Sequence, residues 1–120
     1  MLLHGFGAST YSWTGVIDRL AEYGHVVAYD RPAFGFTDRP MRWRGTNPYS
    51  FQGQIQLLEA VISHFRDGRE VVLVGHSAGG QLALHYAVEY PTKLAGLILE
   101  SPAILTPGPP AFVSKLLRLP

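Results

Sequence analysis

The sequence predicts an α/β fold, a three-layer sandwich in which a mostly parallel sheet lies between layers of helices. Short apolar runs at residues 26–29, 71–74 and 94–99 alternate with segments whose apolar residues recur at helical spacing. Strands separated by helices need crossover connections, so we expect them to pair in parallel. Because the runs are continuously apolar, we also expect both faces of the sheet to be covered.

In the first half of the chain, residues 1–3 are expected to end a strand, and residues 12–23 to form a helix that Gly24 caps. The apolar face of that helix consists of Trp13, Val16, Ile17 and Leu20. A second strand over residues 26–29 ends at Asp30. Residues 31–48 are rich in Arg, Pro and Gly, which predicts a long loop with solvated charges.

In the second half, Ser50 is placed to cap a helix. The apolar stripe of that helix is interpreted as core and not as a cofactor site: Phe51, Ile55, Leu58, Ile62 and Phe65. The strand at 71–74 leads into a glycine-rich turn and a further helix, which Pro91 stops. The strand at 94–99 follows.

Composition excludes several classes of protein. The net charge of +1 gives no electrostatic case for binding nucleic acid. The absence of cysteine excludes disulfides, thiolate zinc sites and thiol catalysis, and it permits the cytoplasm, which is the default expectation. No apolar run reaches membrane-spanning length, and neither a cofactor nor a metal is expected.

Ser77 is the most informative residue of the chain. It is the centre of Gly75-His76-Ser77-Ala78-Gly79, between a predicted strand and a predicted helix, the context in which Gly-x-Ser-x-Gly forms a nucleophile elbow. Such a turn projects the serine hydroxyl from the carboxyl end of the sheet, and the small Gly75 and Gly79 let the strand and helix backbones crowd together. A glycine-rich turn without a catalytic role is the alternative.

A second motif, His4-Gly5-Phe6-Gly7, is expected to lie in the loop after the first strand. Acyl transfer needs two backbone donors aimed at the developing oxyanion. We assign one to the N–H of Ala78 and the other to the N–H of Phe6, with His4, Gly5 and Gly7 shaping the loop. The alternative is a connection shaped only for turning.

Together with the segment Asp30-Arg31-Pro32-Ala33-Phe34-Gly35, these motifs make the chain resemble the α/β-hydrolase family over nearly its whole length. The resemblance implies a serine hydrolase that acts on esters, amides, or carbon–carbon bonds beside a carbonyl. Members commonly carry glycine where this chain has Ala33. Closely similar folds also serve as perhydrolases, lyases and hormone receptors, so the fold alone does not fix a reaction.

The catalytic triad is incomplete in this chain. In the family, an acid and then a histidine follow the serine. Only His85 follows Ser77, and eight residues along one helix separate the two by about 12 Å, too far for a hydrogen bond. Glu100 ends a strand and is a candidate acid, although a loop-forming carboxylate is the preferred interpretation. The remaining histidines are not expected to act as the base: His4, His25, His64 and His76.

Single α/β domains often run to about 200–250 residues, so we interpret these 120 residues as part of a larger enzyme. Residues 1–100 would be a partial hydrolase core and 101–120 the start of a cap or lid, with the triad acid and histidine beyond Pro120. A linker followed by a packed amphipathic helix is the alternative for 101–120. We expect the first strand to be a stub in the sheet, between the strands ending at Asp30 and Gly75, and the core to be poorly held.

The leading prediction is therefore a serine hydrolase whose substrate is a small apolar carbonyl compound, since Phe6, Trp13 and Phe34 fall near the expected site. The oligomeric state is unknown. A non-catalytic ligand-binding or receptor member of the same fold is the first alternative. A dinucleotide fingerprint, with Gly5 and Gly7 after a strand and Asp30 ending the next, is a weaker one because Thr10 occupies the third glycine position.

Overall fold

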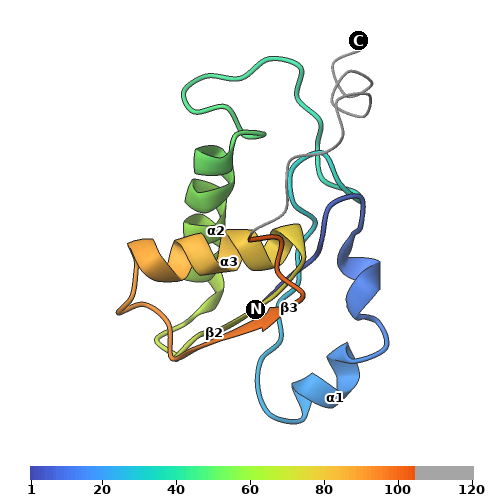
Figure 1. Cartoon of the computed structure of the whole chain (residues 1–120), viewed down its shortest axis with the longest axis vertical. Helices are drawn as coiled ribbons and strands as arrows, with labels where there is room; N and C mark the ends of the chain where they lie inside the picture. The colour runs from blue at the N-terminus through green and yellow to red at the C-terminus, as the bar shows by residue number, and fades with distance from the viewer. Residues whose placement is uncertain (105–120) are drawn as a thin grey trace.

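The computed structural model describes residues 1–104 and contains one parallel sheet (Figure 1). Its strands are β1 (Leu2–Leu3), β2 (Val72–His76) and β3 (Gly96–Glu100), in the order β1-β2-β3. Leu2 is aligned with Val74, and Val72 with Gly96. The predicted α/β class with a parallel sheet is confirmed.

The place of β1 in the sheet is as expected. It pairs with β2 on one side, and on the other side Leu2 forms a single parallel bridge with Ala28. The Leu2 N–H donates to the Val27 carbonyl at 2.8 Å. The prediction of a strand at residues 26–29 is nevertheless wrong, because this segment forms only the single bridge at Ala28. The reason is that β1 offers only two residues to pair with.

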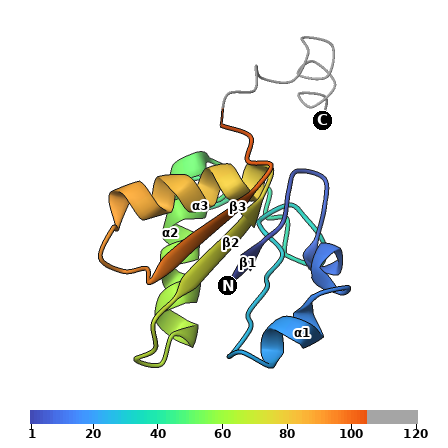
Figure 2. The ribbon, with the colours of Figure 1, turned by 60° about the horizontal axis from the view of Figure 1, so that its bottom comes forward.

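Helices α2 (Phe51–Phe65) and α3 (Ala78–Glu89) lie on one face of the sheet (Figure 2). The Ser50 hydroxyl accepts a hydrogen bond from the Gly53 N–H at 3.0 Å, which confirms the predicted cap, and α3 ends shortly before Pro91. The side chains buried between these layers form the core: Leu3, Ile55, Leu58, Ile62, Val71, Leu73, Leu82, Ala83 and Tyr86.

The predicted helix over residues 12–23 is wrong. The structure has a 3₁₀ turn, η1 (Thr10–Trp13), and a short helix, α1 (Ile17–Ala21). Gly15 lies in the break, where its backbone entropy disfavours a continuous helix. Of the predicted apolar face only Trp13 is buried, so little packing holds the segment helical. Gly24 does not adopt the left-handed conformation of a helix cap.

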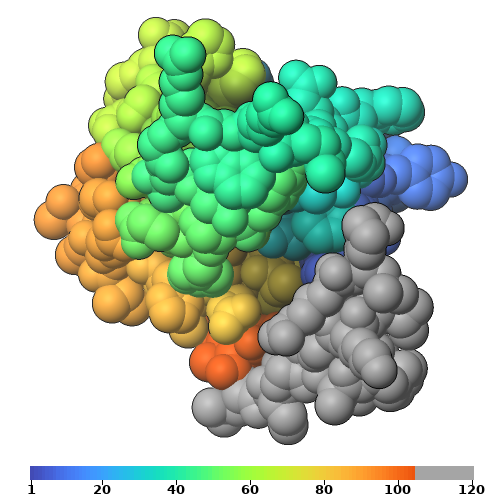
Figure 3. Space-filling model, turned by 90° about the horizontal axis from the view of Figure 1, so that it is seen from above, coloured from blue at the N-terminus to red at the C-terminus, as the bar shows by residue number. Residues whose placement is uncertain are grey.

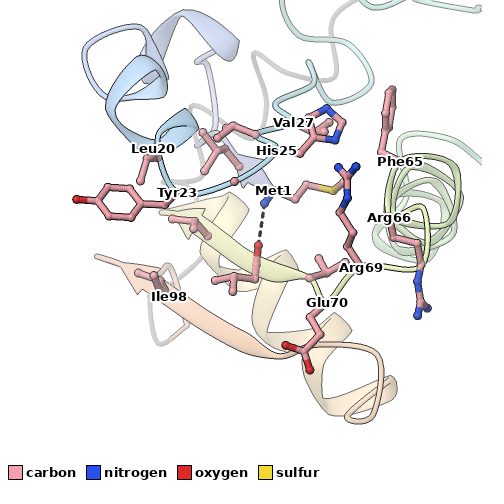
Figure 4. A pocket seen from close by; sticks show the side chains of 16 residues that line it. Met1, Leu20, Tyr23, His25, Val27, Phe65, Arg66, Arg69, Glu70 and Ile98 are labelled. Carbon is pink, nitrogen blue, oxygen red and sulfur yellow. Dashed lines mark hydrogen bonds between the residues drawn. The ribbon is translucent and has the colours of Figure 1, made fainter.

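The second face of the sheet is open in the part of the chain that the structure describes. Val72, Val74 and Ile98 border a hollow of about 470 Å³, and Ile98 is 55% exposed. Figure 4 shows Leu20 and Tyr23 on one side of this hollow and Phe65 on another. The expectation that both faces are covered is therefore wrong for residues 1–104.

Within residues 1–104, no helix is both long and apolar enough to cross a membrane.

Candidate active site

Ser77 occupies a strained turn between β2 and α3. Its φ of 52° and ψ of −118° lie outside the regions that residues other than glycine normally adopt. The backbone is held from two directions: its N–H donates to the Glu100 carbonyl, and its carbonyl accepts from the N–H groups of Gln81 and Ala103. The Ser77 hydroxyl does not cap α3, so it is not engaged by the helix that follows it.

Three glycines let the turn and the first loop pack in contact. A β-carbon on Gly79 would lie 2.3 Å from the Leu3 carbonyl oxygen, and one on Gly75 would lie 2.6 Å from the Gly79 carbonyl oxygen. A β-carbon on Gly5 would lie 3.3 Å from the Cβ of Ser77. The structure therefore places the loop of residues 4–7 directly beside Ser77.

The two expected backbone donors belong to this junction. Ala78 is the first residue of α3, where the N–H groups have no partner within the helix and the helix dipole is positive. Phe6 follows Gly5 in a turn that continues through Gly7, whose φ of 70° favours glycine. Both N–H groups are thus near the carboxyl ends of β1 and β2.

His4 is fully buried behind this loop and makes two hydrogen bonds. Its Nε2 faces the Arg31 N–H at 3.0 Å, and its Nδ1 faces the Gly5 carbonyl oxygen at 2.8 Å. An amide N–H can only donate, so Nε2 accepts and the proton lies on Nδ1. Burial lowers the pKa of His4; the hydrogen bond to Gly5 opposes this and the Arg31 charge adds to it, so the net effect disfavours the protonated ring.

Of the aromatic residues expected near the site, Phe6 and Phe34 contact each other beside it. The Phe34 ring meets the Phe6 ring edge to face, with centroids 5.6 Å apart, and the Phe6 side chain is 67% exposed. Trp13, the third of these residues, is buried, so little of its surface is open to a ligand. The apolar surface beside the Ser77 turn therefore comes from Phe6 and Phe34.

Asp30 joins two loops near the site. Its carboxylate accepts from the Thr10 N–H at 2.7 Å and from the Phe36 N–H at 2.9 Å. Burial opposes ionisation, but these hydrogen bonds outweigh it and lower the pKa of Asp30. A β-carbon on Gly35 would lie 1.9 Å from this carboxylate, so only glycine fits there.

Ala33 occupies the position where the family commonly has glycine, and the structure gives it a φ of 73°. This left-handed conformation is one that glycine adopts without strain. The loop that follows Asp30 covers much of the face seen from above in Figure 3, in teal to green.

The other candidates from the sequence do not meet Ser77 through a side chain. His85 is exposed on α3, with its ring against Phe51 at 4.7 Å between centroids. Glu100 is exposed at the end of β3, paired in register with His76. His76 is partly buried, and its Nδ1 would lie 3.1 Å from a β-carbon on Gly5. Residues 105–120, the expected start of a lid, lie outside the described residues.

Sequence reasoning missed the structural roles of two residues, Asp30 and Arg31. The bridging role of Asp30 had a signal, because an Asp at a strand end often accepts hydrogen bonds from the following turn. The burial of Arg31 had no such signal. An arginine in a Pro- and Gly-rich loop is normally solvated.

Comparison with known proteins agrees with this arrangement. The sequence profile of the alpha/beta hydrolase fold family matches residues 1–118. The chain belongs to the α/β-hydrolase fold family.

Relatives of this α/β-hydrolase chain are longer than the chain itself. It is 37% identical over 119 residues to the abhydrolase domain-containing protein abhd-5.2 of Caenorhabditis elegans, covering 97% of this chain and 26% of that protein. It is 34% identical over 106 residues to the putative 2-succinyl-6-hydroxy-2,4-cyclohexadiene-1-carboxylate synthase of Bacillus subtilis, covering 88% and 36%. The crystal structure of Paleococcus ferrophilus monoacylglycerol lipase aligns with a TM-score of 0.74 and 29% identity, covering 96% and 43%. The chain thus spans less than half the length of each of these relatives.

Proposed function

We propose that this chain carries the nucleophile and the oxyanion site of a serine hydrolase. Ser77 would attack a substrate carbonyl, and the N–H groups of Phe6 and Ala78 would bind the oxygen as it becomes negative. The observation that carries this proposal is the left-handed φ of Ser77 at the start of α3, in a turn packed directly against Gly5. Backbone strain of this kind persists where the surrounding structure enforces it, often at functional sites.

The proposed reaction proceeds by acyl transfer. The Ser77 Oγ forms a bond to the carbonyl carbon while the π electron pair moves onto the carbonyl oxygen. The hydroxyl proton passes to a histidine base, which we expect beyond Pro120, and then to the leaving group as its bond breaks. Water then hydrolyses the acyl-enzyme and restores the Ser77 hydroxyl.

An apolar carbonyl compound is the substrate class that the surface beside Ser77 supports. Phe6 and Phe34 offer aromatic faces there. A hollow of about 510 Å³ between residues 7–12 and 33–39 is mixed in character, with the Arg39 side chain on one side. The lipase among the solved relatives favours an ester, while amides and carbon–carbon bonds beside a carbonyl remain the alternatives.

Labelling with a fluorophosphonate tests the nucleophile. In the full-length protein, Ser77→Ala should abolish covalent labelling, while Ser63→Ala, on the exposed surface of α2, should leave it unchanged. Equal labelling of the wild type and Ser77→Ala would end the assignment. A folded wild type that is not labelled, yet binds an apolar ligand, would favour the non-catalytic ligand-binding alternative.

The dinucleotide alternative loses support at two positions. The Asp30 carboxylate, which would bind a ribose, is already engaged by the Thr10 and Phe36 N–H groups. The loop of residues 4–9 leads into the four-residue 3₁₀ turn η1 and not into a helix whose amino end could hold a pyrophosphate.

A further inference from the structure

Arg31 is a buried cation without a carboxylate partner in the described part of the chain. The residue is only 4% exposed. Nη1 donates to the Gln54 Oε1 in α2 at 2.9 Å, whereas Nε and Nη2 have no partner within residues 1–104. Burying a guanidinium with incomplete pairing costs free energy, so stability alone does not explain its presence.

The surroundings of Arg31 connect it to the proposed oxyanion loop. The centre of its guanidinium lies 5.2 Å from the centroid of the Phe34 ring. That ring meets His4 edge to face at 5.4 Å and Phe6 at 5.6 Å. With Gln54 on one side and Phe34 on the other, the side chain fixes the position of its own backbone N–H, the group that donates to His4.

The tautomer of His4 sets the direction of the Phe6 N–H. The Nδ1 proton of His4 donates to the Gly5 carbonyl oxygen. That oxygen and the Phe6 N–H belong to the same peptide unit, which is planar and has its C=O and N–H pointing in opposite directions. Holding the oxygen toward His4 therefore turns the Phe6 N–H away from His4.

We propose that Arg31 is a positioning residue for the oxyanion donor. Its backbone N–H holds His4 in the Nδ1-protonated form, and His4 in turn orients the Gly5–Phe6 peptide. The positive charge of Arg31 also disfavours a protonated His4 ring. The inference rests on the proposed function for its catalytic consequence. The part of the inference that concerns the tautomer and charge of His4 does not depend on the proposed function.

Protonation of His4 would break this chain of contacts. A proton on Nε2 would face the Arg31 N–H, so two donors would meet and the hydrogen bond between them would be lost. Burial and the Arg31 charge hold the pKa of His4 below its ordinary value of 6.5, while the hydrogen bond to Gly5 and the Asp30 charge act in the opposite direction. Replacing Arg31 by an uncharged residue should therefore raise the pKa of His4.

The first experiment is an imidazole ¹⁵N NMR titration of the full-length protein, with His4 assigned from a His4→Gln variant. The wild type should show a proton on Nδ1 at pH 7.5. Arg31→Met should raise the pKa of His4, while Arg31→Lys should move it less and Arg42→Met, at an exposed loop arginine, should not move it. A proton on Nε2 in the wild type, or an unchanged pKa in Arg31→Met, would overturn the proposal.

The second experiment measures the kinetics of fluorophosphonate labelling on the folded fraction of each variant. Removing one oxyanion donor costs about 100-fold or more in rate, so misaligning one should cost Arg31→Met about tenfold in the maximal rate. The half-saturating concentration should change little. An unchanged maximal rate would refute the positioning role. Labelling that survives Ser77→Ala would instead defeat the proposed function and leave the NMR result to decide whether Arg31 controls His4.

Discussion

Ser77 and Ala33 both have a positive φ, for different reasons. Both have φ in the left-handed region, at 52° and 73°. At Ser77 the strain coincides with the proposed nucleophile, where a side chain is needed and glycine would remove the reactive group. At Ala33 the side chain is exposed and only borders the open hollow between residues 7–12 and 33–39. Strain at Ala33 is therefore open to relief by mutation.

Ala33→Gly should stabilise the full-length protein by about 0.5–1 kcal/mol. A left-handed conformation costs an ordinary residue about 1–2 kcal/mol, from which the greater freedom of glycine in the unfolded chain subtracts part. The midpoint of urea unfolding measures the change. Ala21→Gly, at the end of α1, is the matched control and should be neutral or destabilising. A lower midpoint for Ala33→Gly would show that the loop does not carry this strain.

For single residues, the sequence predicted the structure best where a motif constrains the backbone. In the Gly-x-Ser-x-Gly motif, Gly75 and Gly79 lie where a β-carbon would collide with backbone atoms, and in the first motif Gly7 has a positive φ. Burial of a polar residue was not predictable in this way. Arg31 belongs to a loop whose composition indicates solvent exposure, and only the fold brings Gln54 and Phe34 around it.

At the level of helices and strands, Glu59 of α2 makes the main polar contact between α2 and α3. Its carboxylate accepts hydrogen bonds from Tyr86 of α3, from Lys93 in the connection to β3, and from Ser63. Burial opposes ionisation, but the hydrogen bonds from Lys93 and Tyr86 outweigh it and lower the pKa of Glu59. The contact therefore holds the helix layer together as long as this carboxylate is ionised.

Glu59→Gln should destabilise the full-length protein by about 1.5 kcal/mol at pH 7, the lower end of the range for hydrogen bonds to a charged group, because the Glu59 side chain is partly exposed. Because the folded pKa of Glu59 lies below its ordinary value of 4.5, its contribution is complete above that pH and is lost as the pH falls through the folded pKa. Urea unfolding at pH 7 measures the loss of stability in Glu59→Gln. The same measurement at pH 3.5 should show a smaller difference between the wild type and the variant. Glu70→Gln, at an exposed carboxylate, should leave stability unchanged. Equal losses for the two variants would contradict the role of Glu59.

Elements with a packing partner were predictable from the sequence, and elements without one were not. Helix α2 and strand β2 pack against α3, and both formed where the pattern placed them. In the predicted stripe of α2, Ile55, Leu58 and Ile62 are buried, whereas Phe51 and Phe65 at its ends are 40% and 41% exposed. The pattern at residues 12–23 is equally periodic, yet Val16 and Leu20 stay exposed and the helix is broken. Periodicity shows which face can be buried, whereas tertiary contact decides whether a helix forms.

For the whole molecule, the open face of the sheet has the largest consequence. Its apolar side chains line a hollow of about 470 Å³ opposite the helix layer. Leu73 points toward the helix layer and is buried, whereas its neighbour Val72 points to the other face of the sheet and is exposed. An apolar sheet face left in water favours association with another surface.

The 120-residue chain on its own should therefore self-associate and bind an apolar dye. Ile98→Thr should reduce both effects while leaving the far-ultraviolet circular dichroism unchanged, since threonine suits a strand and the side chain points into the open hollow. Leu73→Thr, in the core-facing register, should instead lower the helical signal because it places a hydroxyl in the core. Sedimentation velocity with dye fluorescence measures the association. A monomeric wild-type chain that binds no dye and melts cooperatively would show that the sheet face is protected by contacts other than those seen in residues 1–104.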